Sequence, residues 1–354
     1  MTANDRLTVG IIFGGKSAEH EVSLQSARNV YDAIDRSRFE PVLIGIDKNG
    51  VWRSTGGSLS LLNTEDPRLI SLNAEGEPVT LAPASAGVLS AQAATPGPKL
   101  DVIFPILHGP LGEDGTVQGL LKLAGVPFVG SGVLGSAVSM DKDVMKRLFR
   151  DAGLPIGKFL RFGSHEQIPS FAEIETALGS PFFIKPANMG SSVGISKVKS
   201  EAEFSNGAKE AFKYDVKIII EEYIPGREIE CAVLGNENPG ASVPGEIIPT
   251  HEFYSYDAKY IDENGARLEI PAKVDGDCKK RIQELSIKAF QTLCCAGLSR
   301  VDFFLKEDGR LLINEINTMP GFTRISMYPK LWEASGIGYT ELISRLIELA
   351  LKNA

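Results

Sequence analysis

The sequence lacks several features that would each indicate a class of protein. It has no excess of positive charge, because its 37 Lys and Arg residues are outnumbered by 45 Asp and Glu residues, and the net charge is −8. Nucleic-acid backbones and anionic membranes attract basic surfaces, so neither is expected as a partner. The chain also has no apolar run long enough to cross a bilayer and no signal-peptide core near its start. We therefore expect a soluble, cytoplasmic protein.

Cysteine is scarce, and the few cysteines are not spaced for metal binding. The chain has four of them, and none forms a Cys-x-x-Cys pair. Two are adjacent in the sequence, which places them poorly for bridging each other. The favoured interpretation is reduced thiols in the core of a cytosolic protein, at Cys231, Cys278, Cys294 and Cys295.

The chain does contain enough apolar residues for a large core, at 43% of 354 residues. More than one domain is the usual outcome at this length. Apolar runs at residues 7–13 and 41–46 flank a helical spacing of apolar residues at 24–34, which predicts a βαβ unit and hence a parallel sheet. From about residue 54 to 99 Ala, Ser, Pro and Gly dominate, and we expect irregular segments between short elements.

The rest of the chain alternates strand and helix patterns, which predicts an α/β (α+β) protein. Further strands are expected at residues 102–106, 127–129, 182–185, 195–198, 216–222, 228–234, 299–305 and 311–317. Helices are expected at residues 116–123, 201–213, 277–296 and 337–351, and between Ser139 as cap and Gly153 as stop.

Two nucleotide-binding motifs match this sequence in their letters but not in their context. Residues 10–17 fit the P-loop pattern G-x-x-x-x-G-K-[ST], but residues 11–13 have the character of a buried strand and not of a loop that wraps phosphate. Residues 130–135 fit the dinucleotide fingerprint G-x-G-x-x-G, but the next expected strand, at 159–162, is not followed by the acidic residue that binds ribose. We interpret the second motif as a structural turn, which disfavours a nicotinamide-dependent oxidoreductase.

A polar patch is predicted on two strands near the C-terminus. Arg300 and Asp302 alternate with apolar residues along the first strand, and Glu315 and Asn317 do so along the second, so each pair shares one face of its strand. Asp-Gly at residues 308–309 is typical of a two-residue hairpin turn. Such a turn places Asp302 opposite Glu315 and Arg300 opposite Asn317.

The chemistry of this patch suits a magnesium site. Facing carboxylates repel each other, and the alternative of a solvated polar face explains poorly why apolar residues alternate so strictly with them. Carboxylate and amide oxygens suit Mg²⁺, which keeps positions open for phosphate oxygens, whereas zinc is disfavoured because no His or Cys lies in the patch. Arg300 would neutralise charge on a phosphoryl group, and the backbone N–H of Gly321, in the turn that follows, would bind an oxyanion.

A loop rich in glycine and serine is the second signal. Residues 185–194 lie between two expected strands and begin with Lys185. Glycines at 190 and 194 permit a loop whose amides and hydroxyls close over phosphates, and Lys185 supplies a point charge. An ordinary Gly/Ser hairpin is the alternative, but the separate magnesium hairpin favours phosphate binding.

A strand that ends in acidic residues is the third signal. Glu221, Glu222 and Tyr223 follow an apolar run, and Glu228 comes soon after. Such a strand end offers backbone and acidic groups to an adenine and a ribose. A linker between domains is the alternative interpretation, and the two are compatible.

Several segments of the chain, taken in order, match a known family. They are Gly14-Gly-Lys-Ser-Ala-Glu19-His-Glu-Val-Ser, His108-Gly with Gly-Glu-Asp-Gly, Met140-Asp-Lys142, Lys185-Pro with Gly-Ser-Ser-Val-Gly, Glu221 with Glu228, Tyr256-Asp-Ala-Lys259-Tyr260, Arg300-Val-Asp302, and Asn314-Glu315-Ile-Asn317-Thr-Met-Pro-Gly-Phe-Thr-Arg-Ile-Ser326-Met-Tyr-Pro. Together they resemble the ATP-grasp fold and, more closely, the D-alanine–D-alanine ligases. The resemblance covers nearly the whole chain and is least informative from about residue 54 to 99.

The resemblance implies three domains and a reaction. The domains are an N-terminal substrate domain with a Rossmann-like parallel sheet (1–139), a central ATP-grasp subdomain with the phosphate-binding loop (140–225), and a C-terminal ATP-grasp subdomain with the magnesium site and a lid (226–354). ATP phosphorylates the carboxylate of one D-alanine, and the amine of a second D-alanine displaces the phosphate. The product, D-alanyl-D-alanine, serves peptidoglycan synthesis, and the family's usual state is a homodimer.

The resemblance also implies a role for each matched residue. The ATP contacts are Lys142, Lys185, Ser191 and Ser192 near the phosphates, and Glu221, Glu222, Tyr223, Ile224 and Glu228 near adenine and ribose. The ligands of two Mg²⁺ ions, for which Mn²⁺ is a substitute, are Asp302, Glu315 and Asn317. The D-alanine contacts are Glu19 and His108 for the first substrate and Lys259, Ser326 and Met327 for the second. The other catalytic groups are Ser191, Tyr260, Arg300 and Gly321. A non-catalytic ATP-binding regulator of this fold would be expected to have lost a metal ligand.

A lid is expected from the chemistry, because an acyl phosphate hydrolyses unless water is excluded. Residues 249–266 are rich in Tyr, Asp and Gly and are the candidate, with an ordinary surface loop as the alternative. The lid would carry Lys259 and Tyr260 over the site. By resemblance, Tyr260 and the apolar Met327 favour D-alanine as acceptor over the D-lactate or D-serine that related ligases use.

Overall fold

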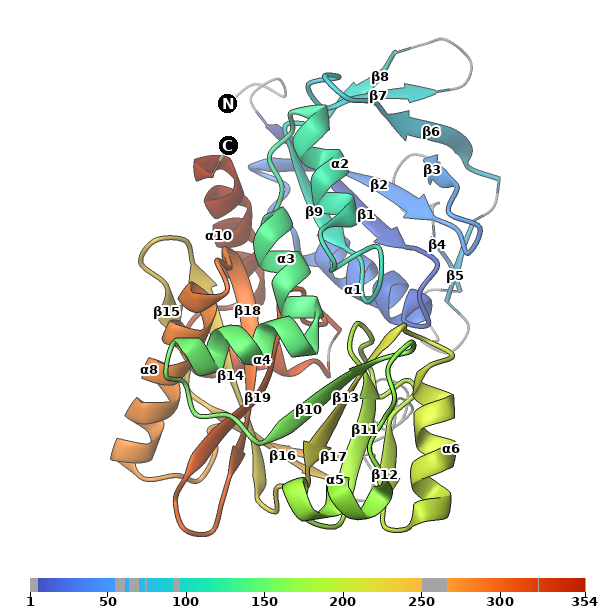
Figure 1. Cartoon of the computed structure of the whole chain (residues 1–354). Coiled ribbons are helices and arrows are strands. Elements are labelled where there is room, and N and C mark those ends of the chain that lie inside the picture. Colours follow the sequence, from blue (N-terminus) through green and yellow to red (C-terminus); the bar gives the residue numbers. More distant parts are fainter. Residues whose placement is uncertain are drawn as a thin grey trace.

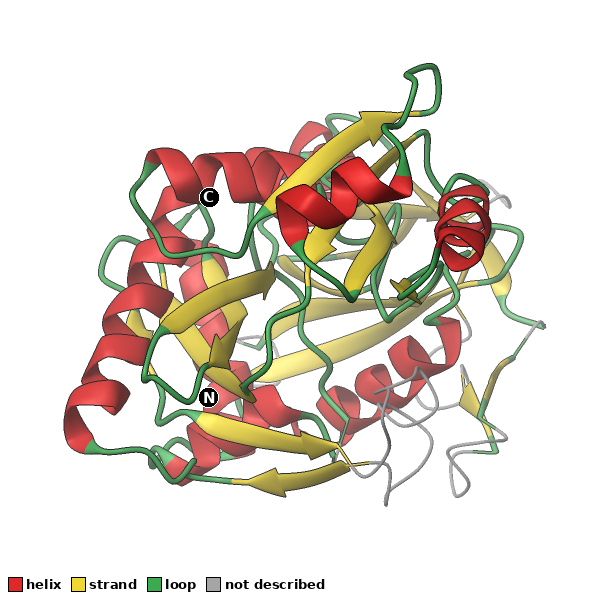
Figure 2. Cartoon of the chain, turned by 60° about the horizontal axis from the view of Figure 1, so that its bottom comes forward, coloured by secondary structure: helices red, strands yellow, loops and turns green. Residues whose placement is uncertain are grey.

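The computed structural model describes residues 6–54, 61–63, 70–73, 75–91, 96–249, 266–323 and 325–353. These residues form three main sheets, with helices packed against them and, in places, between them (Figures 1 and 2). No helix among the described residues is both long and apolar enough to cross a membrane.

The N-terminal sheet begins with the predicted βαβ unit. Strand β1 (Leu7–Gly14) pairs in parallel with β2 (Phe39–Ile46) and with β9 (Val102–Ile106), and α1 (His20–Ala33) connects β1 to β2. Antiparallel strands extend the sheet on the β2 side, within the segment for which we expected irregular structure between short elements. They are β3 (Trp52–Ser54), β6 (Glu77–Leu81), β7 (Val88–Ala91) and β8 (Pro96–Lys99), and a separate small pair is β4 (Leu61–Leu62) with β5 (Ser71–Leu72).

Gly10 and Gly135 show why the two nucleotide motifs have structural roles. Gly10 lies inside β1, where it pairs with both neighbouring strands, so residues 10–17 do not form a phosphate loop. A Cβ atom at Gly135 would lie 2.6 Å from the carbonyl oxygen of Cys294. Only glycine permits that close approach, so this motif serves helix packing.

Three helices follow the first sheet: α2 (Thr116–Ala124), α3 (Val133–Met140) and α4 (Lys142–Asp151). The prediction that Ser139 caps α4 is wrong, because Ser139 lies in the last turn of α3. The cap is Asp141, whose carboxylate accepts hydrogen bonds from the backbone N–H groups of Asp143 and Val144. The Asp141 carboxylate thus satisfies two N–H groups of the first turn that have no partner within the helix. The strand expected at 127–129 is a single bridge between Ile103 and Phe128.

The second sheet is antiparallel, in the order β10-β13-β11-β12. One face is covered by two helices. The expected strands and the second of these helices are confirmed, whereas the first helix was not predicted. The elements are β10 (Phe159–Gly163), α5 (Phe171–Leu178), β11 (Phe182–Pro186), β12 (Ser196–Val198), α6 (Glu201–Ala211) and β13 (Lys217–Glu222).

The third sheet has the order β17-β16-β14-β18-β19. Its strands are β14 (Arg227–Gly235), β16 (Gly245–Pro249), β17 (Ala266–Glu269), β18 (Gly297–Leu305) and β19 (Leu311–Asn317), with β15 (Gly240–Ala241) beside β14. Its helices are α8 (Gly276–Thr292), α9 (Met327–Ala334) and α10 (Tyr339–Lys352). Helix α8 ends at Thr292 and not at the predicted 296, and Cys294 just beyond it has a left-handed φ of 54°.

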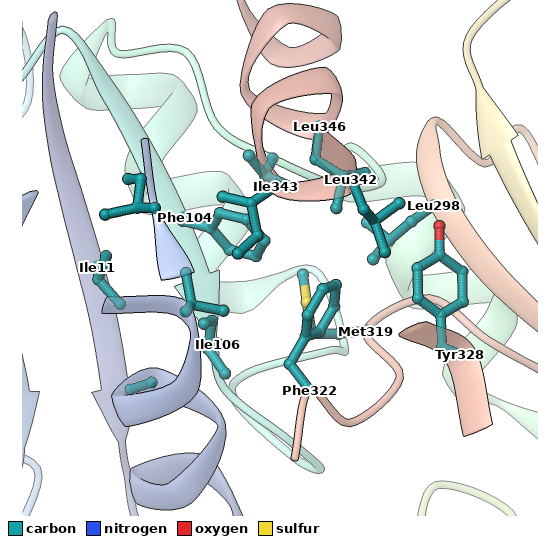
Figure 3. Packing of buried hydrophobic residues seen from close by; sticks show 14 of the residues in the cluster. Ile11, Phe104, Ile106, Leu298, Met319, Phe322, Tyr328, Leu342, Ile343 and Leu346 are labelled. Atoms are coloured by element: carbon teal, nitrogen blue, oxygen red, sulfur yellow. The ribbon is translucent and has the colours of Figure 1, made fainter. Parts of the chain in front are cut away.

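One apolar core joins the first and third sheets. Phe322, in the turn after β19, packs edge to face against Phe104 of β9, with ring centroids 5.7 Å apart. Leu342 and Leu346 of α10 pack in the same cluster (Figure 3). The backbone N–H of Phe322 also donates to Ser26 of α1. These contacts hold the turn after β19 beside the carboxyl ends of β1 and β9.

The cysteines are free, as expected, but they are not all in the core. Cys231 and Cys295 are buried and Cys278 is half-buried, whereas Cys294 is exposed. The left-handed turn after α8 directs Cys294 outward, whereas the next residue, Cys295, is buried. Two adjacent cysteines in a sequence do not indicate which of them is exposed.

Candidate functional site

The β18–β19 hairpin has the predicted pairing, but it reaches that pairing by another route. Arg300 faces Asn317 and Asp302 faces Glu315. The turn is not the predicted two-residue turn, because Lys306 N–H donates to the Arg310 carbonyl and the loop therefore has three residues, 307–309. Near the turn this shifts the pairing by one, and a β-bulge at Asp302/Phe303 shifts it back.

The polar patch on this hairpin is tightly connected. The Arg300 guanidinium donates to both oxygens of Asp302 at 2.7 Å, and Asn317 Nδ2 donates to Asp302 Oδ2 at 3.0 Å. Lys142 Nζ lies 3.5 Å from Glu315 Oε2. The repulsion expected between Asp302 and Glu315 is therefore offset by cations on both sides.

This patch fits a magnesium ion that also binds phosphate. Asp302, Glu315 and Asn317 supply hard oxygen donors on neighbouring strand positions. Among the described residues, no group of three or more His, Cys, Asp or Glu side chains could hold a metal by itself. Mg²⁺ commonly uses one or two carboxylates and takes the rest of its ligands from water and phosphate. The donor set thus suits a metal that arrives with a nucleotide.

The loop between β11 and β12 is the predicted Gly/Ser loop, and its first residues are anchored to the rest of the protein. Ser191 and Ser192 have left-handed φ values of 50° and 63°, which curl the chain. Asn188 donates to Asp215 through its backbone N–H and its side chain, at 2.7 and 2.9 Å. Lys142 Nζ donates to the Met189 carbonyl at 2.7 Å, so the loop is tied to the start of α4.

Glu221 is buried between two lysines. Its two oxygens lie 2.7 Å from Lys146 Nζ and 2.6 Å from Lys185 Nζ. Burial alone would raise the pKa of Glu221, but the two ammonium groups outweigh it and lower the pKa to about 2. The pKa of Lys185 is raised, because its pairing with Glu221 outweighs burial, which alone would lower it. Glu221 is therefore charged at neutral pH.

Lys146 is the site residue that the sequence analysis missed. It is buried, and its ammonium donates to the Asn314 carbonyl at 3.1 Å as well as pairing with Glu221. One signal could have found it. Lys146 lies four residues after Lys142, so the two share a face of α4, and that face meets β13 and β19.

One cavity gathers every residue predicted to contact ATP. It lies between the second and third sheets. The residues of that prediction that line it are Lys142, Lys185, Ser191, Ser192, Glu221, Glu222, Tyr223, Ile224 and Glu228. The Tyr223 side chain is exposed, and its ring lies 6.2 Å from that of Phe183.

A second cavity adjoins the first and gathers the remaining described candidates. Lys142, Ser191, Glu228 and Glu315 line both cavities. The other candidates that line the second cavity are Glu19, His108, Arg300, Asp302, Asn317, Gly321, Ser326 and Met327. The nucleotide contacts and the metal patch thus open onto a chamber formed by all three sheets.

Segments far apart in the sequence meet in this second cavity. Ser191 Oγ donates to Glu19 Oε1, so the phosphate loop contacts the loop after β1. Ser326 Oγ accepts from Thr323 N–H at 2.9 Å at the start of α9, and Met327 is buried in the first turn of that helix. Lys259, Tyr260 and the candidate lid lie in residues 250–265, outside the described residues.

His108 is buried at the floor of the second cavity. Its Nδ1 lies 3.0 Å from the Met319 carbonyl and 3.6 Å from Glu113 Oε1, whereas its Nε2 makes no hydrogen bond to the described residues. Burial alone would lower the pKa of His108, but Glu113 and, to a smaller extent, Glu19 outweigh it, and the pKa is raised. A protonated His108 offers an Nε2–H to an anion in the cavity.

Comparisons with known proteins agree along the whole chain. Residues 8–131 match the model of the D-ala D-ala ligase N-terminus, and residues 148–348 match that of the C-terminus. The chain is 56% identical over 347 residues to a D-alanine–D-alanine ligase of Oceanobacillus iheyensis, covering 97% of this chain and 95% of that one. It is also 56% identical over 351 residues to D-alanine–D-alanine ligase A of Escherichia coli, covering 98% and 96%.

Solved structures show the same fold. The D-alanine–D-alanine ligase of Coxiella burnetii superposes with a TM-score of 0.86 at 36% identity, covering 99% of this chain and 95% of that one. A D-Ala:D-Ser ligase of Enterococcus faecalis superposes with a TM-score of 0.85 at 37% identity, covering 98% and 99%.

Proposed function

The chain belongs to the D-alanine–D-alanine ligase family, and from this premise we propose how its residues carry out the reaction. The protein is an enzyme that uses ATP to join two D-alanines into D-alanyl-D-alanine for cell-wall synthesis. The observation that carries the assignment of residues is the pair of adjoining cavities, one with the nucleotide candidates and one with the D-alanine candidates.

The reaction has two steps. A carboxylate oxygen of the first D-alanine attacks the γ-phosphorus of ATP, the bond to ADP breaks, and an acyl phosphate forms. The amine of the second D-alanine then attacks the carbonyl carbon, loses a proton, and displaces inorganic phosphate. Phosphorylation is needed because a free carboxylate is a poor electrophile, and its oxygen leaves readily only as phosphate.

The first cavity would hold ATP. Lys142, Lys185 and the backbone of the loop at Ser191 and Ser192 would bind the phosphates, since cations and curled backbone N–H groups both favour anions. The adenine and ribose would lie at the strand end formed by Glu221, Glu222, Tyr223 and Ile224, with Glu228 on the ribose. Lys146 would hold the Glu221 carboxylate in position through their ion pair.

Asp302, Glu315 and Asn317 would hold two Mg²⁺ ions, or Mn²⁺ in their place. Such ions neutralise charge on the transferring phosphoryl group and orient it. The protein's part is to fix the donor side chains on a rigid hairpin and to keep Arg300 beside them.

The second cavity would hold both D-alanines. Glu19 would bind the ammonium of the first, held in place by Ser191, and protonated His108 would bind its carboxylate. Lys259 and Ser326 would bind the carboxylate of the second. Arg300 and the N–H of Gly321 would stabilise the oxyanion of the tetrahedral intermediate.

D-Alanine is the acceptor that we propose, with D-lactate or D-serine as the alternative. Met327 is apolar and buried in the cavity wall, and it offers no group that would bind a serine hydroxyl. By resemblance to the family, Tyr260 is the lid residue that favours D-alanine as acceptor. The relatives at 56% identity are D-alanine–D-alanine ligases, whereas the D-Ala:D-Ser ligase is 37% identical.

Three further features belong to this proposal. They are a homodimer, a cytoplasmic location, and a division into domains at residues 1–139, 140–225 and 226–354. The homodimer rests on the family alone, whereas the location and the domains rest on the family and on the sequence pattern.

The test is an assay of phosphate release with ATP and Mg²⁺, in which D-alanine, D-lactate and D-serine are offered alone and in pairs. We expect release to require D-alanine and the main product, identified by its mass, to be D-alanyl-D-alanine. A mixed product that dominates at neutral pH would overturn the choice of acceptor and leave the ligase chemistry intact.

A further inference from the structure

Glu230 is a buried carboxylate beside the metal patch to which no role has yet been given. It lies on β14, where it pairs with Asp302 of β18, and Asp302 in turn pairs with Glu315 of β19. Directly paired residues of adjacent antiparallel strands share a face of the sheet. Three carboxylates thus stand in a row across three strands, and Glu230 is 6% exposed.

Arg300 is the cation that joins two carboxylates of this row, Asp302 and Glu230. Its guanidinium binds Asp302 through Nε and Nη2, and its Nε also lies 3.0 Å from Glu230 Oε2. Both oxygens of Asp302 are thus engaged by Arg300, and Oδ2 also accepts from Asn317.

The hydrogen bonds that Asp302 accepts from Arg300 compete with its proposed role as a metal ligand. A carboxylate oxygen has two lone pairs, and both of those on Asp302 Oδ2 are taken by Arg300 and Asn317. An ion that binds Oδ2 therefore displaces one of these hydrogen bonds, and its charge repels the guanidinium, so that binding of the ion loosens the Arg300–Asp302 pair. Arg300 is needed near the reacting carbon at that moment. A second carboxylate that does not bind the ion can hold it there.

We propose that Glu230 is the positioning residue that retains Arg300 when Asp302 turns to the metal. The proposal rests on the function given above. Glu230 acts through Arg300 and does not touch the substrates. It also competes with Asp302 for the Arg300 guanidinium, which makes Asp302 more available to the ion. Loss of Glu230 therefore weakens both metal binding and the second chemical step.

The test uses Glu230→Gln with a control from the same sheet. Gln keeps the volume of the buried side chain and removes its charge. The matched control is Glu246→Gln, because Glu246 is 7% exposed, lies on the adjoining strand β16, and pairs with Arg227 at 2.8 and 2.6 Å away from the catalytic groups. Both variants lose one buried carboxylate paired to one arginine.

The first readout does not depend on turnover. Mn²⁺ is titrated onto each protein with ADP present and D-alanine absent, and free Mn²⁺ is measured by its electron paramagnetic resonance signal. We expect Glu230→Gln to weaken Mn²⁺ binding several-fold and Glu246→Gln to leave it within about twofold of wild type, since only one of the two pairs contacts a metal ligand.

The second readout is a double-mutant cycle on kcat. We expect Glu230→Gln to lower kcat about tenfold with little change in the KM for ATP, as a lost charge-assisted hydrogen bond would. In an Arg300→Lys background the same change should lower kcat less than about twofold, because a residue that acts through Arg300 has nothing left to position. If Glu230→Gln does not fold, Glu230→Asp replaces it, with a smaller loss in the same direction.

Two results would overturn the proposal. One is a Glu230 variant that matches Glu246→Gln in Mn²⁺ binding and kcat, and the other is a loss that adds in full to that of Arg300→Lys. Wild-type enzyme in the same assay separates the two levels of inference. If wild type makes no D-alanyl-D-alanine, the proposed function is wrong, whereas a normal wild type with an unaffected Glu230 variant contradicts the role of Glu230 alone.

Discussion

The first cavity, which is the proposed nucleotide cavity, and the second, which is the proposed D-alanine cavity, are built in different ways. Around the nucleotide cavity the charged side chains bind one another, as in the buried group of Lys146, Glu221 and Lys185. Around the D-alanine cavity the contacts join loops of the first sheet to the other two sheets, as from Ser191 to Glu19 and from His108 to the Met319 carbonyl. The first arrangement pairs its buried charges without a ligand, because Glu221 lies between two ammonium groups. The second brings together groups from all three sheets and depends on how those sheets pack.

Replacement of a proposed metal ligand should have the largest effect. Asp302→Asn keeps the shape and removes the charge that the ion needs. We expect kcat to fall about a thousandfold, which corresponds to about 4 kcal/mol. Steady-state kinetics measure the loss, and Mn²⁺ titration should show weaker binding. Asp308→Asn, in the exposed turn of the same hairpin, is the control and should behave as wild type. A fall of less than tenfold in Asp302→Asn would remove Asp302 from the metal site.

Removal of the charge on Glu221 should destabilise the fold. Glu221→Gln leaves two buried ammonium groups without their carboxylate, and breaking a buried pair costs about 3–5 kcal/mol. Urea unfolding at neutral pH measures this cost. Glu210→Gln, which weakens an exposed pair with Lys213, is the control and should unfold at nearly the same urea concentration as wild type.

The same carboxylate predicts a dependence on pH. The pKa of Glu221 is lowered in the folded protein from 4.5 to about 2. Its contribution to stability is therefore complete above 4.5 and is lost as the pH falls toward 2. Wild type should lose stability over this range more steeply than Glu221→Gln. Parallel curves for the two proteins would mean that the buried group does not titrate as its environment requires.

Changes in the D-alanine cavity should act on substrate affinity more than on stability. Glu19→Gln removes the anion proposed for the ammonium of the first D-alanine. We expect its KM to rise about tenfold or more, with the KM for ATP nearly unchanged. Glu21→Gln, in the first turn of α1 and paired with exposed Lys48, is the control. If the KM values for ATP and D-alanine rose together, the two cavities would not be separable in function.

The smallest effect expected is a shift in pH dependence at His108. Its raised pKa means that the charge that binds a carboxylate is present at low pH and is lost as the pH rises through that pKa. Glu113→Gln removes the main cause of the shift. The pH at which the KM for the first D-alanine rises should therefore be lower in Glu113→Gln than in wild type, with differences of a few-fold at neutral pH. An unchanged profile would contradict the role of His108.

The sequence predicted the pairing within the β18–β19 hairpin better than the packing between sheets. Alternation along the strands placed Arg300 with Asp302 and Glu315 with Asn317, because a period of two is a local property. The turn was wrong by one residue, and the bulge at Asp302/Phe303 that compensates has no signal in the local pattern. The extra loop residue and the bulge shift the pairing in opposite directions, so the predicted pairing of these residues was correct.

Contacts between distant segments were the hardest to predict from residues alone. Nothing in the pattern near Lys146 indicates that its partner is Glu221, since the pair forms only when α4 packs on the second sheet. The proposed role of Glu230 could not be predicted either, because it depends on the pairing of β14 with β18. Glu19 and His108 entered the prediction through the family resemblance, and the structure places them in one cavity.

The central claim, that the carboxylate of the first D-alanine is phosphorylated by ATP before the peptide bond forms, has a direct test. D-Alanine labelled with ¹⁸O in its carboxyl group is supplied with ATP, and the inorganic phosphate released is analysed by mass spectrometry. An acyl phosphate intermediate requires one ¹⁸O atom in the phosphate for each dipeptide made. Dipeptide formation with unlabelled phosphate would contradict this mechanism.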